Sequence, residues 1–137
     1  MRKIKVGVLG ATGMVGQRFV TLLENHPWFE LVLLAASPQS AGKNYLEAVS
    51  QRWKLDKPIP DYVKNIKLVA VEEDLEKIAQ EVDLVFSALD LEKESIKEIE
   101  NRFAEKGVAV VSNNSAHRWT PDVPMFIPEI NANHLSL

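Results

Sequence analysis

Short apolar runs alternate with amphipathic stretches along the chain. Four segments are short and centred on apolar, often β-branched residues, which is typical of strands buried inside a sheet: 4–9, 31–36, 83–87 and 108–111. Weaker runs at 67–71 and 125–127 indicate two further strands. The pattern therefore predicts a sheet of about six strands.

Three longer stretches place apolar residues three and four positions apart, the spacing that gives a helix one buried face. They cover residues 14–25, 75–82 and 92–106. Pro27 ends the first helix because proline cannot continue it, and Gly107 is expected to cap the third. Strands and helices thus alternate, which favours a parallel α/β sheet, doubly wound, with helices on both faces.

The length of 137 residues fits one domain. Only the stretch 49–66 breaks the alternation, because its apolar residues have no clean period and it holds Pro58 and Pro60. We expect an irregular excursion there.

The turn between the first strand and the first helix is rich in glycine. Gly10, Gly13 and Gly16 give a G-x-x-G-x-x-G spacing, a variant of the fingerprint in which glycines permit a tight turn, close approach of a pyrophosphate and close helix packing. The amides and dipole at the helix start favour an anion. An ordinary structural turn is the alternative, but the flanking strand and helix favour dinucleotide binding by a Rossmann-type fold.

The end of the second strand bears on which dinucleotide is bound. NAD-type sites place an acidic residue there to accept hydrogen bonds from the ribose hydroxyls. No carboxylate lies between Leu31 and Tyr45, whereas Ser37, Ser40 and Lys43 offer donors suited to a 2′-phosphate. The segment therefore favours NADP over NAD. A serine-rich loop that caps the next helix is the alternative.

Composition narrows the classes of function. Sixteen Lys and Arg against 19 Asp and Glu give a net charge of −3, which makes nucleic acid a poor candidate partner. The chain has no cysteine and only 3 isolated histidines, so neither a thiol nucleophile nor a metal site is indicated. No apolar run reaches the ~20 residues of a membrane helix, and the start does not read as a signal peptide. We expect a cytoplasmic protein with no membrane partner.

Several motifs resemble one family. Residues 10–16 read Gly-Ala-Thr-Gly-Met-Val-Gly, 35–43 read Ala-Ala-Ser-Pro-Gln-Ser-Ala-Gly-Lys and 112–118 read Ser-Asn-Asn-Ser-Ala-His-Arg. With Pro-Asp-Val-Pro at 121–124 and Ile-Pro-Glu-Ile-Asn at 127–131, they resemble the aspartate-semialdehyde dehydrogenases, in the branch typical of archaea, fungi and some bacteria. The first motif is common among nucleotide-binding proteins, whereas the later motifs are more specific.

The resemblance implies an oxidoreductase of lysine, threonine and methionine biosynthesis. It would convert β-aspartyl phosphate, an acyl phosphate, to aspartate semialdehyde at the expense of NADPH. In that family a cysteine thiolate attacks the acyl carbon, and a histidine of a second domain acts as acid and base. This chain has no cysteine. We therefore expect residues 1–137 to be the NADP-binding domain of a longer, homo-oligomeric enzyme, inactive by itself.

The resemblance also assigns site residues. The residues expected around the cofactor are Gly10, Thr12, Gly13, Met14, Val15 and Gly16 at the pyrophosphate, Ser37, Ser40 and Lys43 at the 2′-phosphate, and Ser87, Ala88, Leu89 and Asn114 at the sheet edge. Arg118 resembles the family arginine that grips the substrate phosphate with two guanidinium nitrogens. A plain turn residue and a solvated loop charge are the alternatives for Asn114 and Arg118.

Other functions remain open at this point. N-acetyl-glutamyl-phosphate reductases perform the same chemistry on a longer carboxylate, and malonyl-CoA reductases use a thioester. A non-catalytic NADP-binding regulatory module is a third possibility. Extended short-chain dehydrogenases share the glycine-rich turn but require Tyr-x-x-x-Lys, whereas Tyr45 and Tyr62 are followed four residues on by Val49 and Ile66.

Overall fold

The computed structural model describes residues 2–114, 116–117, 120–121 and 123. Its strands form one sheet: β1 (Ile4–Leu9), β2 (Phe29–Ala36), β3 (Val69–Ala70), β4 (Leu84–Ser87) and β5 (Ala109–Ser112). The strands pair in the order β3-β2-β1-β4-β5, and every pair is parallel. The predicted parallel α/β sheet is therefore confirmed. The strand predicted at 125–127 lies outside the described residues.

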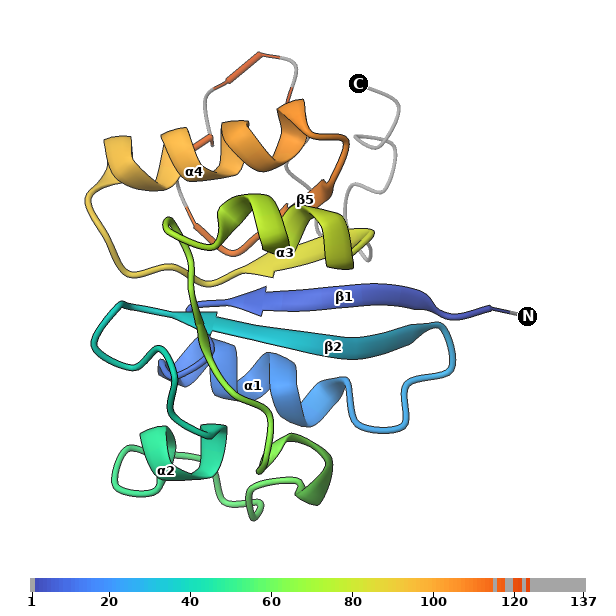
Figure 1. Cartoon of the computed structure of the whole chain (residues 1–137), viewed down its shortest axis with the longest axis vertical. Helices are drawn as coiled ribbons and strands as arrows, with labels where there is room; N and C mark the ends of the chain where they lie inside the picture. Colours follow the sequence, from blue (N-terminus) through green and yellow to red (C-terminus); the bar gives the residue numbers. More distant parts are fainter. Residues whose placement is uncertain (1, 115, 118–119, 122, 124–137) are drawn as a thin grey trace.

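Helices lie on both faces of the sheet (Figure 1), and each face has its own hydrophobic core. The helices are α1 (Met14–Leu22), α2 (Tyr45–Val49), α3 (Leu75–Glu81) and α4 (Lys93–Glu105). Val20 of α1 and Val49 of α2 belong to one core, and Ile78 of α3 and Phe103 of α4 belong to the other. Because both faces of the central strands are buried, their sequences are nearly continuous in apolar residues.

The helix ends follow local backbone geometry. Helix α1 ends three residues before the predicted Asn25, because Asn25 adopts a left-handed φ of 56° and so cannot continue the helix. Helix α4 ends at Glu105, and Gly107 closes it as predicted, with a left-handed φ of 82°. There the Gly107 N–H donates to the Ala104 carbonyl (3.0 Å) and the Val108 N–H to the Phe103 carbonyl (3.1 Å), the paired bonds of a Schellman motif.

The stretch 49–66 is irregular, as predicted, apart from the end of α2 and a 3₁₀ turn at Asp61–Val63. It is not detached from the fold, because Trp53 and Ile59 pack against the core beneath α1 and α2. No helix in the described part of the chain combines the length and the apolar character needed to cross a membrane.

Candidate dinucleotide-binding site

The sheet order places a crevice at the carboxyl end of β1. Strand β1 pairs with β2 on one side and with β4 on the other, so the crossover connections leave in opposite directions at this point. Open α/β sheets bind their ligands at such a switch point. A cleft of about 370 Å³ lies there, and Gly10, Ala36, Val71 and Ala88 contribute to its lining from the ends of β1 to β4.

Gly10 and Gly16 are required by packing. Gly10 has a left-handed φ of 77°, and a Cβ there would overlap the carbonyl oxygen of Ala88. A Cβ on Gly16 would overlap the carbonyl oxygen of Gly10 and lie 2.8 Å from Cα of Ala11. These two glycines therefore let the turn and α1 press against the sheet.

Gly13 has a different environment. A Cβ built on it would meet only the Gly10 carbonyl oxygen, at 3.8 Å, and Gly13 lines the cleft together with Thr12. It is also the N-cap of α1 and has no side-chain cap, so the first amides of the helix lack acceptors within the helix. Such a bare helix start beside an open space suits a phosphate group. The side chains of Met14 and Val15 are exposed and do not line the cleft.

The segment after β2 contributes another part of the cleft lining. The carbonyl oxygen of Ser37 accepts hydrogen bonds from the N–H groups of Ser40 (3.0 Å) and Ala41 (3.1 Å), which folds the segment into a tight turn. Ser37 and Ser40 both line the cleft. Lys43 lies beyond this turn, is exposed, and is not among the lining residues.

Arg52 is a lining residue that the sequence analysis missed. It belongs to the irregular stretch, and Gln17 connects it to the glycine-rich turn: the Gln17 Nε2 donates to the carbonyl oxygens of both Thr12 and Arg52, each at 3.0 Å. The available signal was Gln17 itself, a polar residue three positions before Val20 on the buried face of α1. No residue spacing points to Arg52.

Ser87 and Asn114 belong to a partly buried polar network and are not among the residues that line the cleft. The Asn114 Nδ2 donates to the Ser87 Oγ (3.0 Å) and to a Glu100 carboxylate oxygen (3.2 Å), and the Ser112 hydroxyl donates to the same carboxylate oxygen (2.7 Å). This network ties the ends of β4 and β5 to α4. Ala88 and Leu89 do line the cleft, and Arg118 lies outside the described residues.

From residue 5 to residue 137, the sequence matches the family described as semialdehyde dehydrogenase, NAD binding domain. The chain belongs to this family. The aspartate-semialdehyde dehydrogenase of Archaeoglobus fulgidus is 46% identical over 135 residues, covering 98% of this chain and 37% of the relative. That of Saccharomyces cerevisiae is 46% identical over 131 residues, covering 96% of this chain and 34% of the relative. The chain thus spans little more than a third of these relatives.

Solved structures agree with this membership. Aspartate-semialdehyde dehydrogenase with NADP from Candida albicans superposes with a TM-score of 0.87 at 41% identity, covering 98% of this chain and 36% of that chain. Aspartate-semialdehyde dehydrogenase II of Vibrio cholerae, complexed with ASA, gives a TM-score of 0.73 at 25% identity, covering 98% and 39%. The predicted family, with its archaeal and fungal relatives, is confirmed, and this member is an NAD(P)-binding Rossmann-type domain.

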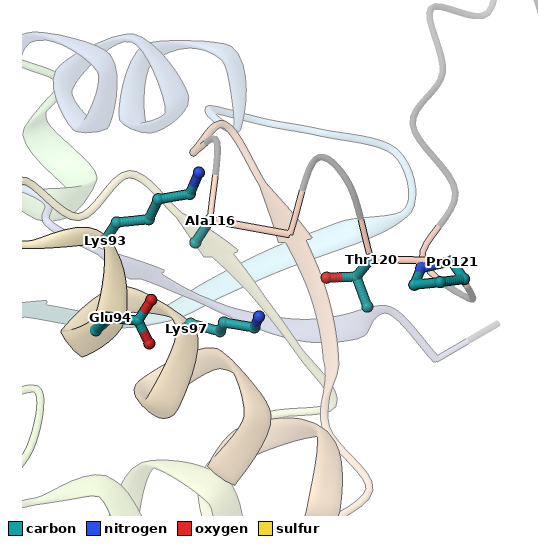
Figure 2. A pocket seen from close by; sticks show the side chains of 6 residues that line it. All are labelled: Lys93, Glu94, Lys97, Ala116, Thr120 and Pro121. Atoms are coloured by element: carbon teal, nitrogen blue, oxygen red, sulfur yellow. The ribbon is translucent and has the colours of Figure 1, made fainter.

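A second hollow of this semialdehyde dehydrogenase domain, about 350 Å³, lies between the start of α4 and the segment after β5 (Figure 2). The ends of Lys93 and Lys97 extend toward Ala116 and Thr120, with Glu94 between the two lysines in sequence. It shares no lining residue with the dinucleotide cleft. Its charges are ends of α4 side chains near the surface, and we assign it no role.

Tyr45 is hydrogen-bonded to the glycine-rich turn. Its ring is fully buried, and its hydroxyl donates to the Ala11 carbonyl oxygen at 2.8 Å. Burial, with a smaller contribution from Tyr62, raises the pKa of Tyr45 well above its ordinary value of 10.0. The folded protein therefore keeps this phenol protonated at pH values where the unfolded chain releases the proton.

Tyr45→Phe is expected to lower the free energy of unfolding by ~1–2 kcal/mol at neutral pH, because the Ala11 carbonyl loses its buried partner. The wild type loses stability as pH rises through the unfolded pKa near 10, since only its unfolded state releases the Tyr45 proton. The variant lacks this contribution and should lose less stability from about pH 10 to 11. Urea unfolding at a series of pH values measures both effects. Parallel stability curves for the two proteins would contradict this account of Tyr45.

Proposed function

We propose that residues 1–137 form the NADP(H)-binding domain of an aspartate-semialdehyde dehydrogenase. The full enzyme would reduce β-aspartyl phosphate to aspartate semialdehyde and release phosphate. The observation that carries the proposal is the cleft at the sheet switch point, lined by an open Gly13 and by Ser37 and Ser40 rather than by a carboxylate at the end of β2. The aspartate-semialdehyde dehydrogenase relatives support the choice of substrate.

In this proposal, different residues bind different parts of the cofactor and the substrate. The amides at the start of α1 bind the pyrophosphate, and the Ser37 and Ser40 hydroxyls donate to the 2′-phosphate. NADPH, when bound, supplies the hydride. Ala88 and Leu89 follow β4 and line the cleft, so they would contact the cofactor and help to exclude water there. Arg118 holds the substrate phosphate.

The remaining chemistry needs groups that this chain does not contain. It has no cysteine, so the thiolate that attacks the acyl carbon, and the histidine acid and base, belong in this proposal to a second domain of a longer homo-oligomeric enzyme. Catalysis is therefore tested on the enzyme that carries this domain. An assay with β-aspartyl phosphate, N-acetyl-glutamyl phosphate and malonyl-CoA distinguishes the three related reactions, and a preference for either of the last two would reject our choice.

NADPH is expected to bind at least about tenfold more tightly than NADH, because Ser37 and Ser40 offer donors to a 2′-phosphate where an NAD-type site has a carboxylate. Isothermal titration of the protein with each reduced cofactor measures the ratio. Titration curves that are the same for NADPH and NADH would contradict a preference for NADP. The cleft would then be a dinucleotide site that does not distinguish the two cofactors.

A further inference from the structure

We propose that Arg52 binds a phosphate of the dinucleotide, and that Gln17 is a positioning residue that holds Arg52 at the cleft. This rests on the proposed function, because it assigns two further residues to the same cofactor site. It also replaces Lys43, the cation that the sequence favoured for this role.

The charge of the cleft singles out Arg52. Among the residues that the structure describes, Arg52 is the one lysine or arginine that lines the cleft, whereas Glu72, Glu73 and Asp90 also line it. Within the described ranges, the ion pairs involve other cations, and no carboxylate pairs with Arg52. Its guanidinium is therefore available to a ligand, and without it every formal charge among the described lining residues is negative. An anionic cofactor would then meet only repulsion from these side chains.

Gln17 fixes where the Arg52 backbone lies. Its side chain is 1% exposed and makes three hydrogen bonds, so both amide protons and the oxygen are satisfied. One nitrogen donates to the carbonyls of Thr12 and Arg52, each at 3.0 Å, and the oxygen accepts from the Lys54 N–H at 3.0 Å. Because two carbonyls share one donor nitrogen, the Arg52 backbone is held directly beside the glycine-rich turn.

The chain around Arg52 is held on both sides. The Arg52 N–H donates to the Val49 carbonyl at 2.8 Å, which joins it to the end of α2. After it, the Trp53 ring packs on the core, and the Trp53 Nε1 donates to the Lys57 carbonyl at 2.7 Å. A guanidinium on such a fixed backbone suits phosphate better than the ammonium of Lys43, because it presents several donors in one plane.

The test compares Arg52→Gln with Lys43→Gln, which removes the same charge from the segment after β2. Titration of the protein should show NADPH affinity about tenfold weaker for Arg52→Gln and within about twofold of wild type for Lys43→Gln. NADH distinguishes the phosphates: unchanged NADH affinity in Arg52→Gln identifies the 2′-phosphate, and an equal loss identifies the pyrophosphate. Wild-type affinity of Arg52→Gln for NADPH, or a larger loss in Lys43→Gln, would overturn the assignment.

Gln17→Met tests the positioning role, because it removes all three hydrogen bonds at similar side-chain length. We expect NADPH affinity to fall about fivefold in the wild-type background and to change little further in Arg52→Gln, since coupled residues are not additive. An equal fall in both backgrounds would show that Gln17 acts on the turn alone. Thermal unfolding verifies that each variant folds. If Gln17→Met does not fold, Gln17→Leu replaces it, because it also removes the three hydrogen bonds and adds no charge beside the cleft.

The two proposals fail in different ways. If the wild type binds NADPH and substitution of Gly13 by valine blocks it, while Arg52→Gln binds normally, then only the role of Arg52 is wrong. If the wild type binds neither NADPH nor NADH, the proposed function itself fails.

Discussion

Gly13→Val is expected to weaken NADPH binding by at least about 100-fold and to leave the fold intact. Gly13 lines the cleft, and a Cβ there has only the Gly10 carbonyl oxygen within 4 Å, at 3.8 Å. The added side chain would therefore occupy the space that we propose for the pyrophosphate. A phosphate kept away from the α1 amides loses charge-assisted hydrogen bonds, each worth ~1.5–3 kcal/mol. Loss of two such bonds accounts for the expected change.

Stability should barely respond to this substitution. Gly13 has φ of −78° and ψ of 170°, an extended conformation that valine adopts without strain. The free energy of unfolding should therefore change by no more than ~1 kcal/mol. Circular dichroism and thermal unfolding measure the fold, and cofactor titration measures the affinity. Gly13→Ala is the graded control, with a smaller loss of affinity. If Gly13→Val bound NADPH with wild-type affinity, the proposed position of the cofactor would be wrong.

The fold could be predicted from the sequence where burial dictates the pattern. Strands β1, β2 and β4 are buried on both faces, so apolar runs mark them directly. Strand β3 pairs only with β2 and only at Val69 and Ala70, so the run 67–71 overstates its length. The end of α1 depends on the left-handed conformation of Asn25, which a hydrophobic period does not record.

The candidate site could be predicted only where one local segment forms it. The turn at 10–16 and the serines after β2 each lie within one short stretch of sequence, so their functional groups can be recognised there. Thr12, Gly13, Ser37 and Ser40 do line the cleft. Arg52 reaches the same cleft through a hydrogen bond between residues 35 positions apart in sequence. Such a long-range contact through a buried amide leaves no periodic pattern. For the same reason, the Glu100 network around Asn114 was not foreseen.

Gly16→Ala is expected to destabilise the protein by ~2–3 kcal/mol and to lower its melting temperature by roughly 8 °C. Helix propensity alone gives the opposite sign, because alanine inside a helix is favoured over glycine by about 1 kcal/mol. Packing decides the outcome: the new Cβ would overlap the Gly10 carbonyl oxygen and lie 2.8 Å from Cα of Ala11. Both are backbone atoms of the turn, so α1 must move off the sheet to make room.

Gly13→Ala provides the matched control for this effect, because it adds the same methyl group three residues earlier in the same motif. It meets only the Gly10 carbonyl oxygen at 3.8 Å, so its melting temperature should stay close to that of the wild type. Calorimetry or thermal circular dichroism of the two variants compares them directly. A rise in melting temperature for Gly16→Ala would mean that α1 is not pressed against the turn. It would also contradict the cleft geometry that depends on this contact. A melting temperature that falls in Gly16→Ala but not in Gly13→Ala would instead show that the two glycines have different roles. Gly16 would be needed for packing of the helix, and Gly13 would be the glycine that leaves room for a phosphate.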